Sequence, residues 1–442
     1  MSSHLWSENA SFSAGTLQLS GISVAQLAKD FGTPTFFLDE LAFRSRALSW
    51  QSGIEQEFGS DAGTVFYAAK SFICTAVAQW IADLGIGIDV CTGGELAVAL
   101  AGGVNPAKIE VHGNNKSLSE IERAVTAGVK CIVLDSLFEI ERVAKSAKDN
   151  GVRQGIMIRL TPGVDAHTHE KISTAHEDVK FGFSIASGAA WQAIEEILQY
   201  PELNLLGVHC HIGSQIFGSS AHELATDRLL GFMAKFRDAL GYQLPELNLG
   251  GGFAIAYIDA EQTVEPSDVL PAMYQAVVAG CKKYSLDIPK ISIEPGRNIV
   301  GPTMFTLYEV GTVKDVTIES GLVRKYVSVD GGMSDNARTA LYDAEYSAFI
   351  AQRISAAPLA LSRLVGKHCE TGDIIIKEIS LPSDIAPGDL IATPATGAYG
   401  RSMASNYNHV PRPPVVAVKD GKARVIVRRE NEADLLALDV KE

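Results

Sequence analysis

The feature that most constrains the fold is an alternation of short apolar runs with stretches of helical spacing, which begins near residue 60. The apolar runs predict eight strands, at residues 64–68, 86–90, 109–112, 131–134, 156–160, 205–211, 246–249 and 291–294. Helical spacing follows at residues 73–84, 94–101, 118–127, 137–150, 189–200, 224–240 and 269–284, after a first helix at 41–58. Strands and helices that alternate over roughly 250 residues are typical of a (β/α)8 TIM-type barrel. A doubly wound sheet is the alternative.

The pattern changes after Pro302 to short β-rich runs, at residues 304–308, 326–329, 373–376, 414–418 and 423–427. These runs predict a C-terminal β-domain, either a sandwich or an open barrel, with one helix-like stretch at 346–356. A helix at 24–31 and a strand start at 35–38 precede the alternating part. We therefore expect an N-terminal segment, 1–36, that packs with the β-domain, then a barrel, 37–302, and a β-domain, 303–442.

Composition limits the class of protein. A formal net charge of -14 argues against a nucleic-acid surface. The most apolar windows are interrupted by Asp83, Asp89 or Lys130, so no membrane span is expected. The polar start predicts no secretory signal. The six cysteines form no CxxC pair, so neither a zinc ribbon nor a disulfide framework is indicated, and we expect a cytoplasmic protein.

Lys70 directly follows the apolar run that ends at Ala68 and Ala69. A lysine at the mouth of an apolar strand is costly to desolvate while it is charged, so its pKa tends to fall. Its amine then becomes available for Schiff-base chemistry. The alternative is an ordinary surface lysine just past a strand end.

Further polar residues lie at or just after the carboxyl ends of the other predicted strands, where barrel enzymes build their sites. They are Asp89, His112, Arg159, His209, His211, the glycines 250–252 and Glu294. Strand ends are often polar in any case. A set that combines an amine, imidazoles, acids and three consecutive glycines is harder to explain in that way.

Gly250, Gly251 and Gly252 follow a predicted strand directly, and their bare N–H groups could approach an anion closely. A tight turn is the alternative. Arg297 and Ser214 add a guanidinium and a hydroxyl near other strand ends. Converging on one anion, these groups fit a small phosphorylated cofactor, although their spacing matches neither a Walker loop nor GxGxxG.

A pocket lysine combined with a phosphate cradle points to pyridoxal 5'-phosphate. Glu294 could keep the pyridine nitrogen of this cofactor protonated, which makes the ring a strong electron sink. His211 could lie flat against the ring, and Asp89 could orient the lysine or the substrate amine.

A metal site is the alternative for His209 and His211, because residues two apart on a strand face the same way. No further ligand set is visible nearby in the sequence, so no metal is expected. Three more histidines, His167, His169 and His176, lie in a polar loop at 161–183. A solvated loop is their default interpretation, although the length of the loop suggests a functional role.

Several motifs together resemble the diaminopimelate decarboxylase family, which belongs to the alanine racemase-like, fold type III pyridoxal phosphate enzymes. The motifs are Phe66-Tyr67-Ala68-Ala69-Lys70, His209-Cys210-His211-Ile212-Gly213-Ser214-Gln215, Gly250-Gly251-Gly252-Phe253, Glu294-Pro295-Gly296-Arg297, Cys369-Glu370 and Gly397-Ala398-Tyr399-Gly400. They occur in matching order from about Phe37 to the end of the chain, so chance agreement is improbable.

The resemblance implies a cofactor-bearing barrel, a C-terminal β-domain and a homodimer whose sites are completed across the interface. It makes Lys70 the Schiff-base lysine, His211 the ring-stacking residue and Glu294 the partner of the pyridine nitrogen. Ser214, Gly250, Gly251, Gly252, Arg297 and Tyr399 fall where the family binds phosphate or substrate.

Cys369 and Glu370 match the pair that the second subunit contributes in this family. A thiol suits proton delivery to carbon after carbon dioxide leaves; a buried small hydrophobe is the alternative for Cys369. Arg338 and Tyr342 resemble the residues that bind the substrate, with Arg297 and Tyr399 assisting and Glu370 pairing with the distal ammonium group. An ordinary surface arginine is the alternative for Arg338.

The expected reaction is decarboxylation of meso-diaminopimelate to L-lysine and carbon dioxide, the last step of lysine biosynthesis. Thr339 and Thr371 stand where many family members have proline and serine, which bears on fine substrate preference. The alternatives are a sister decarboxylase for ornithine, lysine, arginine or a carboxylated polyamine, a racemase, and a non-catalytic regulatory homologue or cofactor-storage protein. An arginine facing the ammonium tail of a simple diamino acid would be repulsive, which argues against the sister decarboxylases.

Overall fold

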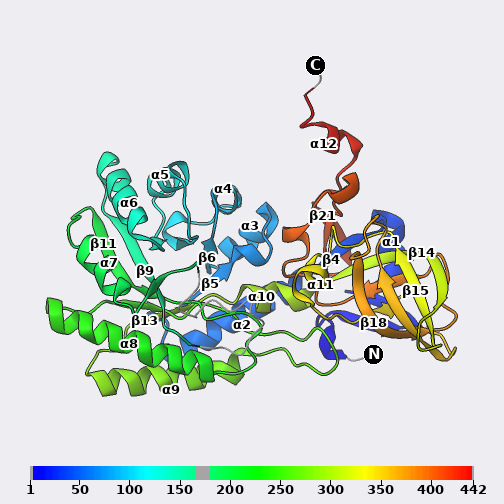
Figure 1. The fold of residues 1–442 in the computed structure, drawn as a ribbon, viewed down its shortest axis with the longest axis horizontal. Coiled ribbons are helices and arrows are strands. Elements are labelled where there is room, and N and C mark those ends of the chain that lie inside the picture. The colour runs from blue at the N-terminus through cyan, green and yellow to red at the C-terminus, as the bar shows by residue number, and fades with distance from the viewer. Residues whose placement is uncertain (1–2, 165–179, 441–442) are drawn as a thin grey trace. The chain divides into compact units, whose positions relative to one another are not determined.

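The computed structural model describes residues 3–164 and 180–440, and their contacts divide the chain into two compact units (Figure 1). The barrel unit consists of Arg46–Ala254 and Val264–Asn298, and the β unit of Met1–Ser45, Ile255–Thr263 and Ile299–Glu442. The predicted loop histidines His167, His169 and His176 lie outside the described residues, as does most of their loop.

The strands of the barrel unit form a closed parallel sheet. Within the described residues the closed order is β5 (Gly63–Ala68), β6 (Gly87–Val90), β7 (Ile109–Val111), β8 (Cys131–Leu134), β9 (Gln154–Thr161), β11 (Leu203–His209), β12 (Glu246–Asn248) and β13 (Lys290–Ile293). β13 pairs back onto β5, and β8 pairs with β9. The predicted barrel is confirmed, and this closure excludes the doubly wound sheet. A short strand, β10 (Phe183–Ser184), pairs with the end of β9.

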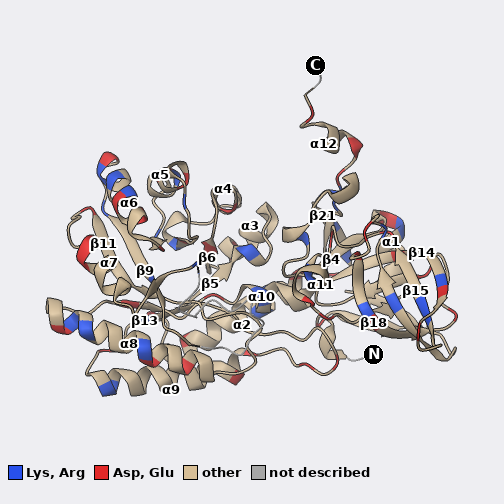
Figure 2. Ribbon diagram, viewed as in Figure 1, with Lys and Arg blue, Asp and Glu red and all other residues tan. Residues whose placement is uncertain are grey.

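The helices between these strands lie on the outside of the barrel (Figure 1). They are α2 (Glu40–Phe58), α3 (Thr75–Asp83), α4 (Gly93–Ala101), α5 (Leu118–Ala127), α6 (Leu137–Asp149), α7 (Ala189–Ile197), α8 (Ser220–Leu240) and α9 (Pro266–Tyr284). Local signals set their ends: α5 begins at a Ser117–Glu120 capping box and ends at Gly128, which has φ 72°. Figure 2 shows basic and acidic residues interspersed along α6, α8 and α9. Among the described helices, none combines the length and apolar character needed to cross a membrane.

The β unit is organised around the long strand β14 (Met304–Thr317). It pairs with β15 (Val323–Val329), β19 (Leu390–Thr393) and β4 (Thr35–Asp39). The sheet continues through β17 (Leu359–Val365) and β18 (Ile374–Pro382) on one side, and through β20 (Val415–Lys419) and β21 (Lys422–Val427) on the other. Short elements complete the unit: β1 (Ala10–Ser13), β2 (Thr16–Leu19), β3 (Ile22–Ser23), α1 (Val24–Phe31), β16 (Phe349–Ile350), α11 (Arg338–Tyr342) and α12 (Glu432–Leu436). A short helix, α10 (Gly296–Val300), follows β13.

The structure differs from the sequence-based boundaries at β4. We expected the barrel to begin at residue 37, but β4 pairs with β14 and β20 in the β unit, which extends to Ser45. All five residues of β4 are buried, so this strand needs neighbours on both edges and cover on both faces. The β unit supplies them, together with an apolar cluster that includes Leu27, Phe37 and Phe305.

The helix predicted at 346–356 is wrong. This segment contains β16, and the nearest helix is instead α11 at Arg338–Tyr342. Tyr346, Ala348 and Ile350 are buried while the residues between them are half-buried, which is the period of a strand and not of a helix. The strands β17 and β19 were not predicted, because their sequences lack a long apolar run.

Candidate functional site

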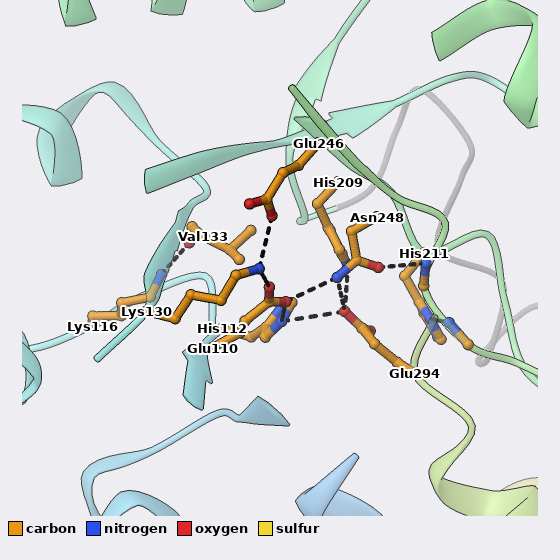
Figure 3. Close-up of polar contacts among 12 residues, drawn as sticks. Glu110, His112, Lys116, Lys130, Val133, His209, His211, Glu246, Asn248 and Glu294 are labelled. Atoms are coloured by element: carbon orange, nitrogen blue, oxygen red, sulfur yellow. Dashed lines mark hydrogen bonds and ion pairs between the residues drawn. The ribbon is translucent and has the colours of Figure 1, made fainter. Parts of the chain in front are cut away.

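Parallel strands bring their carboxyl ends to one rim of a barrel, and the predicted polar residues meet at this rim. Lys70 lies in the 3-10 turn (Ala69–Ser71) that follows β5, and Asp89 lies in β6. His209 ends β11, and Glu294 directly follows β13. Figure 3 shows the interior of this region, in which His209 and Glu294 point toward one another.

Glu294 is the best-connected acid of the site. Its Oε1 accepts a hydrogen bond from Asn248 Nδ2 at 2.9 Å and lies 3.0 Å from His209 Nε2 and 3.3 Å from His112 Nε2. Burial alone would raise the pKa of Glu294, but His209, His112 and Lys70 hold the pKa well below its usual range. Glu294 is therefore a buried carboxylate at neutral pH.

The two imidazoles beside Glu294 have opposite protonation preferences. Burial lowers the pKa of His209 to about 4, so this ring is neutral. Burial alone would lower the pKa of His112 as well, but Glu294, Glu110 and Asp89 together raise the pKa of His112 above its usual value. Two imidazoles beside the same carboxylate are thus shifted in opposite directions, His112 toward the protonated form and His209 toward the neutral form.

His112, His209 and Glu294 offer donor atoms that lie within 4.8 Å of one another, an arrangement that a metal ion could also use. This group differs from the one considered in the sequence, because neither Cys210 nor His211 belongs to it. The sulfur of Cys210 faces the carbonyl of Leu249 instead. Glu294 lies 3.3 Å from His112 and 3.0 Å from His209, so the three side chains already contact one another directly, and we do not assign them as metal ligands.

The glycine turn 250–252 forms hydrogen bonds within the protein that the sequence did not indicate. Gly250 N–H donates to Asn248 Oδ1 at 2.8 Å, and Gly251 N–H donates to His211 Nδ1 at 3.3 Å. The expectation that all three amides are bare is therefore wrong for two of them.

The turn itself requires glycine. Gly250 has φ 67°, and a Cβ at Gly251 would lie 2.1 Å from the carbonyl oxygen of Glu294. Burial, with help from Lys70, lowers the pKa of His211 well below its usual value, so its ring is neutral. A neutral Nδ1 can accept the N–H of Gly251, and this contact fixes the orientation of the imidazole ring.

Arg297 and Ser214 meet, as expected of two groups that bind one anion. Arg297 Nη2 and Nε lie 2.8 and 3.2 Å from Ser214 Oγ, and the guanidinium is largely buried. A guanidinium presents its N–H donors in a fixed planar fork, so a buried arginine next to a hydroxyl suits the recognition of a phosphate group.

The hydrogen bonding of Asp89 shows whether the site fits pyridoxal phosphate. Its Oδ2 is buried and has no hydrogen-bond partner among the described residues. Burial and the nearby charge of Glu294 raise the pKa of Asp89 to about 8. A buried carboxyl oxygen without a partner is rare in proteins and indicates a ligand group. A lysine, an arginine beside a hydroxyl, a buried carboxylate and the buried carboxyl group of Asp89 are a set of residues that fits this cofactor.

The predicted substrate residues lie in the β unit. Arg338 is buried, its Nη1 donates to Tyr346 Oη at 2.6 Å, and its guanidinium lies 4.4 Å from the ring centroid of Tyr257. The alternative of an ordinary surface arginine is therefore wrong. Tyr342 ends α11 and is half-buried, and Tyr399 has φ 61° in a turn of the same unit.

Cys369 and Glu370 lie in an exposed loop between β17 and β18. The backbone N–H of Cys369 donates to Asn408 Oδ1, while Glu370 Oε1 accepts from Thr371 Oγ1 and from the N–H of Gly372. These bonds to Gly372 and Thr371 lower the pKa of Glu370. The alternative of a buried small hydrophobe at Cys369 is wrong, because its thiol is on the surface of this chain.

Sequence reasoning missed Glu110, Asn248 and Lys130, which contact this site or one another inside the barrel. The missed signal is a polar residue inside a short buried strand, as in Ile109-Glu110-Val111 and Leu247-Asn248-Leu249. His222 was missed too. Its Nε2 lies 3.2 Å from the carbonyl oxygen of Gly251, and its ring stacks on Phe253.

Comparisons with known proteins give the family of this chain. Residues 43–301 match the family model of the pyridoxal-dependent decarboxylases, pyridoxal binding domain. The chain is 49% identical to diaminopimelate decarboxylase of Mycobacterium tuberculosis, with 99% of this chain and 98% of the relative covered. It is 42% identical to diaminopimelate decarboxylase of Bacillus subtilis, with 96% and 95% covered.

A solved structure has the same fold over nearly the whole chain. Diaminopimelate decarboxylase of M. jannaschii in complex with L-lysine aligns with a TM-score of 0.90 at 31% identity, covering 99% of this chain and 98% of that one. Sequence and fold therefore agree. This chain belongs to the pyridoxal-dependent decarboxylases, and within them to the diaminopimelate decarboxylase family.

Proposed function

We propose that this chain removes the carboxyl group at the D centre of meso-diaminopimelate and releases L-lysine and carbon dioxide. The observation that carries the proposal is Glu294, a buried carboxylate held between His112, His209 and Asn248. A carboxylate in this setting can keep a pyridine nitrogen protonated. The substrate is proposed from the names of the relatives, which are diaminopimelate decarboxylases.

The cofactor is pyridoxal 5'-phosphate, and when bound it supplies an electron sink for the electron pair that departing carbon dioxide leaves behind. We assign Lys70 as the amine that binds the cofactor covalently. Glu294 holds the proton on the ring nitrogen, the neutral ring of His211 packs on the cofactor face, and Asp89 orients the amine groups.

The phosphate end of the cofactor needs anion-binding groups. We assign this role to Arg297 and Ser214, whose side chains contact each other, to the glycine turn 250–252, and to Tyr399. The N–H groups of Gly250 and Gly251 already bind Asn248 and His211, so the amide of the turn that we assign to the phosphate is that of Gly252.

Substrate selection is proposed for the β unit. Arg338 would bind the distal carboxylate of diaminopimelate, with Tyr342, Arg297 and Tyr399 assisting, and Glu370 would pair with the distal ammonium group. The support is the burial of Arg338 against phenol groups, which leaves its charge without a protein carboxylate among the described residues. Such a cation favours a ligand with a carboxylate over one with only an ammonium tail.

Cys369 is assigned as the group that returns a proton to the substrate carbon. Its exposure on this chain supports the further proposal that the active enzyme is a homodimer in which Cys369 and Glu370 serve the site of the partner subunit. A cytoplasmic location is also proposed, because the six cysteines are free thiols.

The test is release of lysine and carbon dioxide by the purified protein loaded with pyridoxal phosphate. Meso-diaminopimelate would be compared with ornithine, lysine and arginine at equal concentrations. Turnover confined to diaminopimelate supports both the chemistry and the role of Arg338. Turnover of another amino acid would retain the cofactor assignment and overturn the proposed roles of Arg338 and Glu370.

A further inference from the structure

A column of hydrogen-bonded polar side chains crosses the interior of the barrel and ends at Glu294 (Figure 3). Lys130 Nζ lies 2.8 Å from both Glu246 Oε2 and Glu110 Oε1. Glu110 Oε2 accepts from Asn248 Nδ2 at 2.9 Å, and the same Nδ2 donates to Glu294 Oε1 at 2.9 Å. One amide group thus joins two buried carboxylates.

These contacts span the barrel and do not run along its wall. Glu110 lies on β7, whereas Asn248 and Glu246 lie on β12, and β7 pairs with β6 and β8 only. Side chains from non-neighbouring strands can meet only inside the barrel. Branched apolar residues usually fill this space, and buried charges carry a desolvation penalty. The column is therefore costly for stability alone, which points to a functional reason for it.

The far end of the column reaches solvent. A cavity of about 350 Å³ opens among the amino ends of the strands and is lined by Lys130, Glu246, Thr64, Gly87 and Ser292, among others. The side chain of Lys130 is 24% exposed, whereas that of Glu110 is 0% exposed. The ammonium group of Lys130 is therefore partly exposed to solvent, whereas the carboxylate of its partner Glu110 is fully buried.

Lys130 keeps Glu110 charged. Burial alone would raise the pKa of Glu110, but Lys130 and His112 lower it. Burial would lower the pKa of Lys130, but Glu110 and Glu246 raise it above its usual range. Both members of the pair are ionised near neutral pH.

The charge of Glu110 reaches Glu294 by two routes. The first is the shared amide of Asn248. The second is His112, whose Nε2 lies 3.9 Å from Glu110 Oε2 and 3.3 Å from Glu294 Oε1, so both carboxylates favour the imidazolium form. Among the described residues, the other titratable groups that interact with Glu294 include His209, Lys70, Asp89, His211, Cys91 and Cys210.

We propose that Lys130 and Glu110 are positioning residues for the decarboxylation. Lys130 holds Glu110 as an anion, and Glu110 in turn orients Asn248 and retains the proton of His112. Asn248 and the His112 imidazolium together keep Glu294 an anion that faces the cofactor ring nitrogen. This inference rests on the proposed role of Glu294, and neither Lys130 nor Glu110 needs to touch cofactor or substrate.

Lys130→Met tests the inference, with Lys290→Met as the matched control. Lys290 lines the same cavity, is exposed, and lies on the strand that leads to Glu294, but it forms no ion pair with Glu110. The main readout is the pH midpoint at which the visible absorption band of the bound cofactor changes, recorded on the holoenzyme without substrate. The second readout is the separate pH dependence of kcat and KM.

In Lys130→Met, burial raises the pKa of Glu110, so Glu110 becomes neutral and no longer helps His112 to retain its proton. Glu294 then loses the nearby positive charge of His112 and takes up a proton more readily. We expect the spectral midpoint and the acid limb of kcat to move to higher pH by about one unit, since a neighbouring charge shifts a pKa by roughly 1–3 units. KM should stay unchanged. Lys290→Met should match the wild type, and Lys130→Arg should restore the wild-type midpoint. A midpoint in Lys130→Met equal to that of the control would overturn the inference, even if the variant were less stable.

Two further variants separate the possible failures. If Glu294→Gln leaves the spectral titration unchanged, the proposed role of Glu294 is wrong, and the role of the column falls with it. If Glu294→Gln changes the titration but Lys130→Met does not, the inference alone fails. Should Lys130→Met not fold, Lys130→Met/Glu110→Gln removes both charges, and His112 then loses a carboxylate. The spectral midpoint of this double variant should also move to higher pH, and an unshifted midpoint would refute the role of the column.

Discussion

The interiors of the two units differ in where they place charged side chains. The core of the β unit is mainly apolar, with Tyr308, Val327, Leu364 and Ile375 in one cluster. The space inside the barrel strands instead holds a chain of ion pairs and amide bonds that ends at Glu294. Apolar burial stabilises a fold, whereas charges placed in a barrel interior set the protonation of a bound group. The barrel interior is thus adapted to the cofactor at some cost in stability.

The buried charges of the two units also differ in how they are compensated. In the barrel, Lys130 and His112 face carboxylates at short range. In the β unit, Arg338 is buried among neutral phenol groups of Tyr346 and Tyr257. A buried charge that faces a protein charge of opposite sign shifts the pKa of its neighbours. A buried charge that contacts only neutral groups can still attract a ligand of opposite sign. We infer that the barrel prepares the cofactor and that the β unit selects the substrate.

The largest effect is expected for Lys70→Ala. Without the amine the cofactor cannot be bound covalently, so turnover should fall below detection and the visible band should be lost after gel filtration. Lys148→Ala, on the exposed face of α6, should keep both properties. A variant at Lys70 that retains the coloured adduct would refute the assignment.

Cys369→Ala should lower kcat about 100-fold, because a positioned proton donor contributes roughly 10²–10⁴-fold. The cofactor spectrum should not change. Cys281→Ala removes a buried thiol at the end of α9 and should leave kcat near the wild-type value. Equal kcat in Cys369→Ala and wild type would mean that another group returns the proton.

Arg338→Met should raise KM for meso-diaminopimelate by about tenfold or more, since a hydrogen bond to a charged group contributes roughly 1.5–3 kcal/mol. Arg363→Met is the control, because Arg363 also lies over a tyrosine ring of the β unit, at 5.6 Å from the centroid of Tyr326. Steady-state kinetics on both variants separates the two. An unchanged KM in Arg338→Met would move substrate recognition to another residue.

The smallest effect concerns stability against acid. Burial lowers the pKa of His222 from 6.5 to about 4, so the unfolded chain binds more protons in this window and stability falls as the pH decreases from 6.5 to 4. His112 has the opposite sign: its pKa is raised, so its contribution is present below 6.5 and is lost as the pH rises through the folded-state pKa.

His222→Gln should therefore flatten the slope of unfolding free energy against pH between 6.5 and 4. Urea unfolding at a series of pH values measures this slope. A slope equal to that of the wild type would show that His222 is protonated in the folded protein.

The sequence predicts the barrel well and the β unit less well, for a physical reason. Strands buried on both faces, such as Cys131–Leu134, read as continuous apolar runs. In β17 (Leu359–Val365) only Ser362 and Leu364 are buried, so the run that marks a strand is missing. β4 gave a clear strand signal, but its partners β14 and β20 are far away in sequence, so its place could not be predicted from local pattern.

The candidate site shows the same limit. Lys70, Glu294 and Arg297 stand in motifs, and their chemistry can be predicted from residue type. The column through Glu110 and Asn248 depends on strands that are distant in sequence and meet across the barrel. The sequence does show polar residues inside short buried strands. Only the closed barrel shows that these residues face one another in its interior.

The most direct test of the division between the units compares Glu294→Gln with Arg338→Met on one preparation of holoenzyme each. We predict that Glu294→Gln changes the visible spectrum of the bound cofactor and lowers kcat with little change in KM. Arg338→Met should raise KM for meso-diaminopimelate and leave the spectrum unchanged. If Arg338→Met altered the spectrum as strongly as Glu294→Gln, or if Glu294→Gln acted only through KM, the division of work would be contradicted.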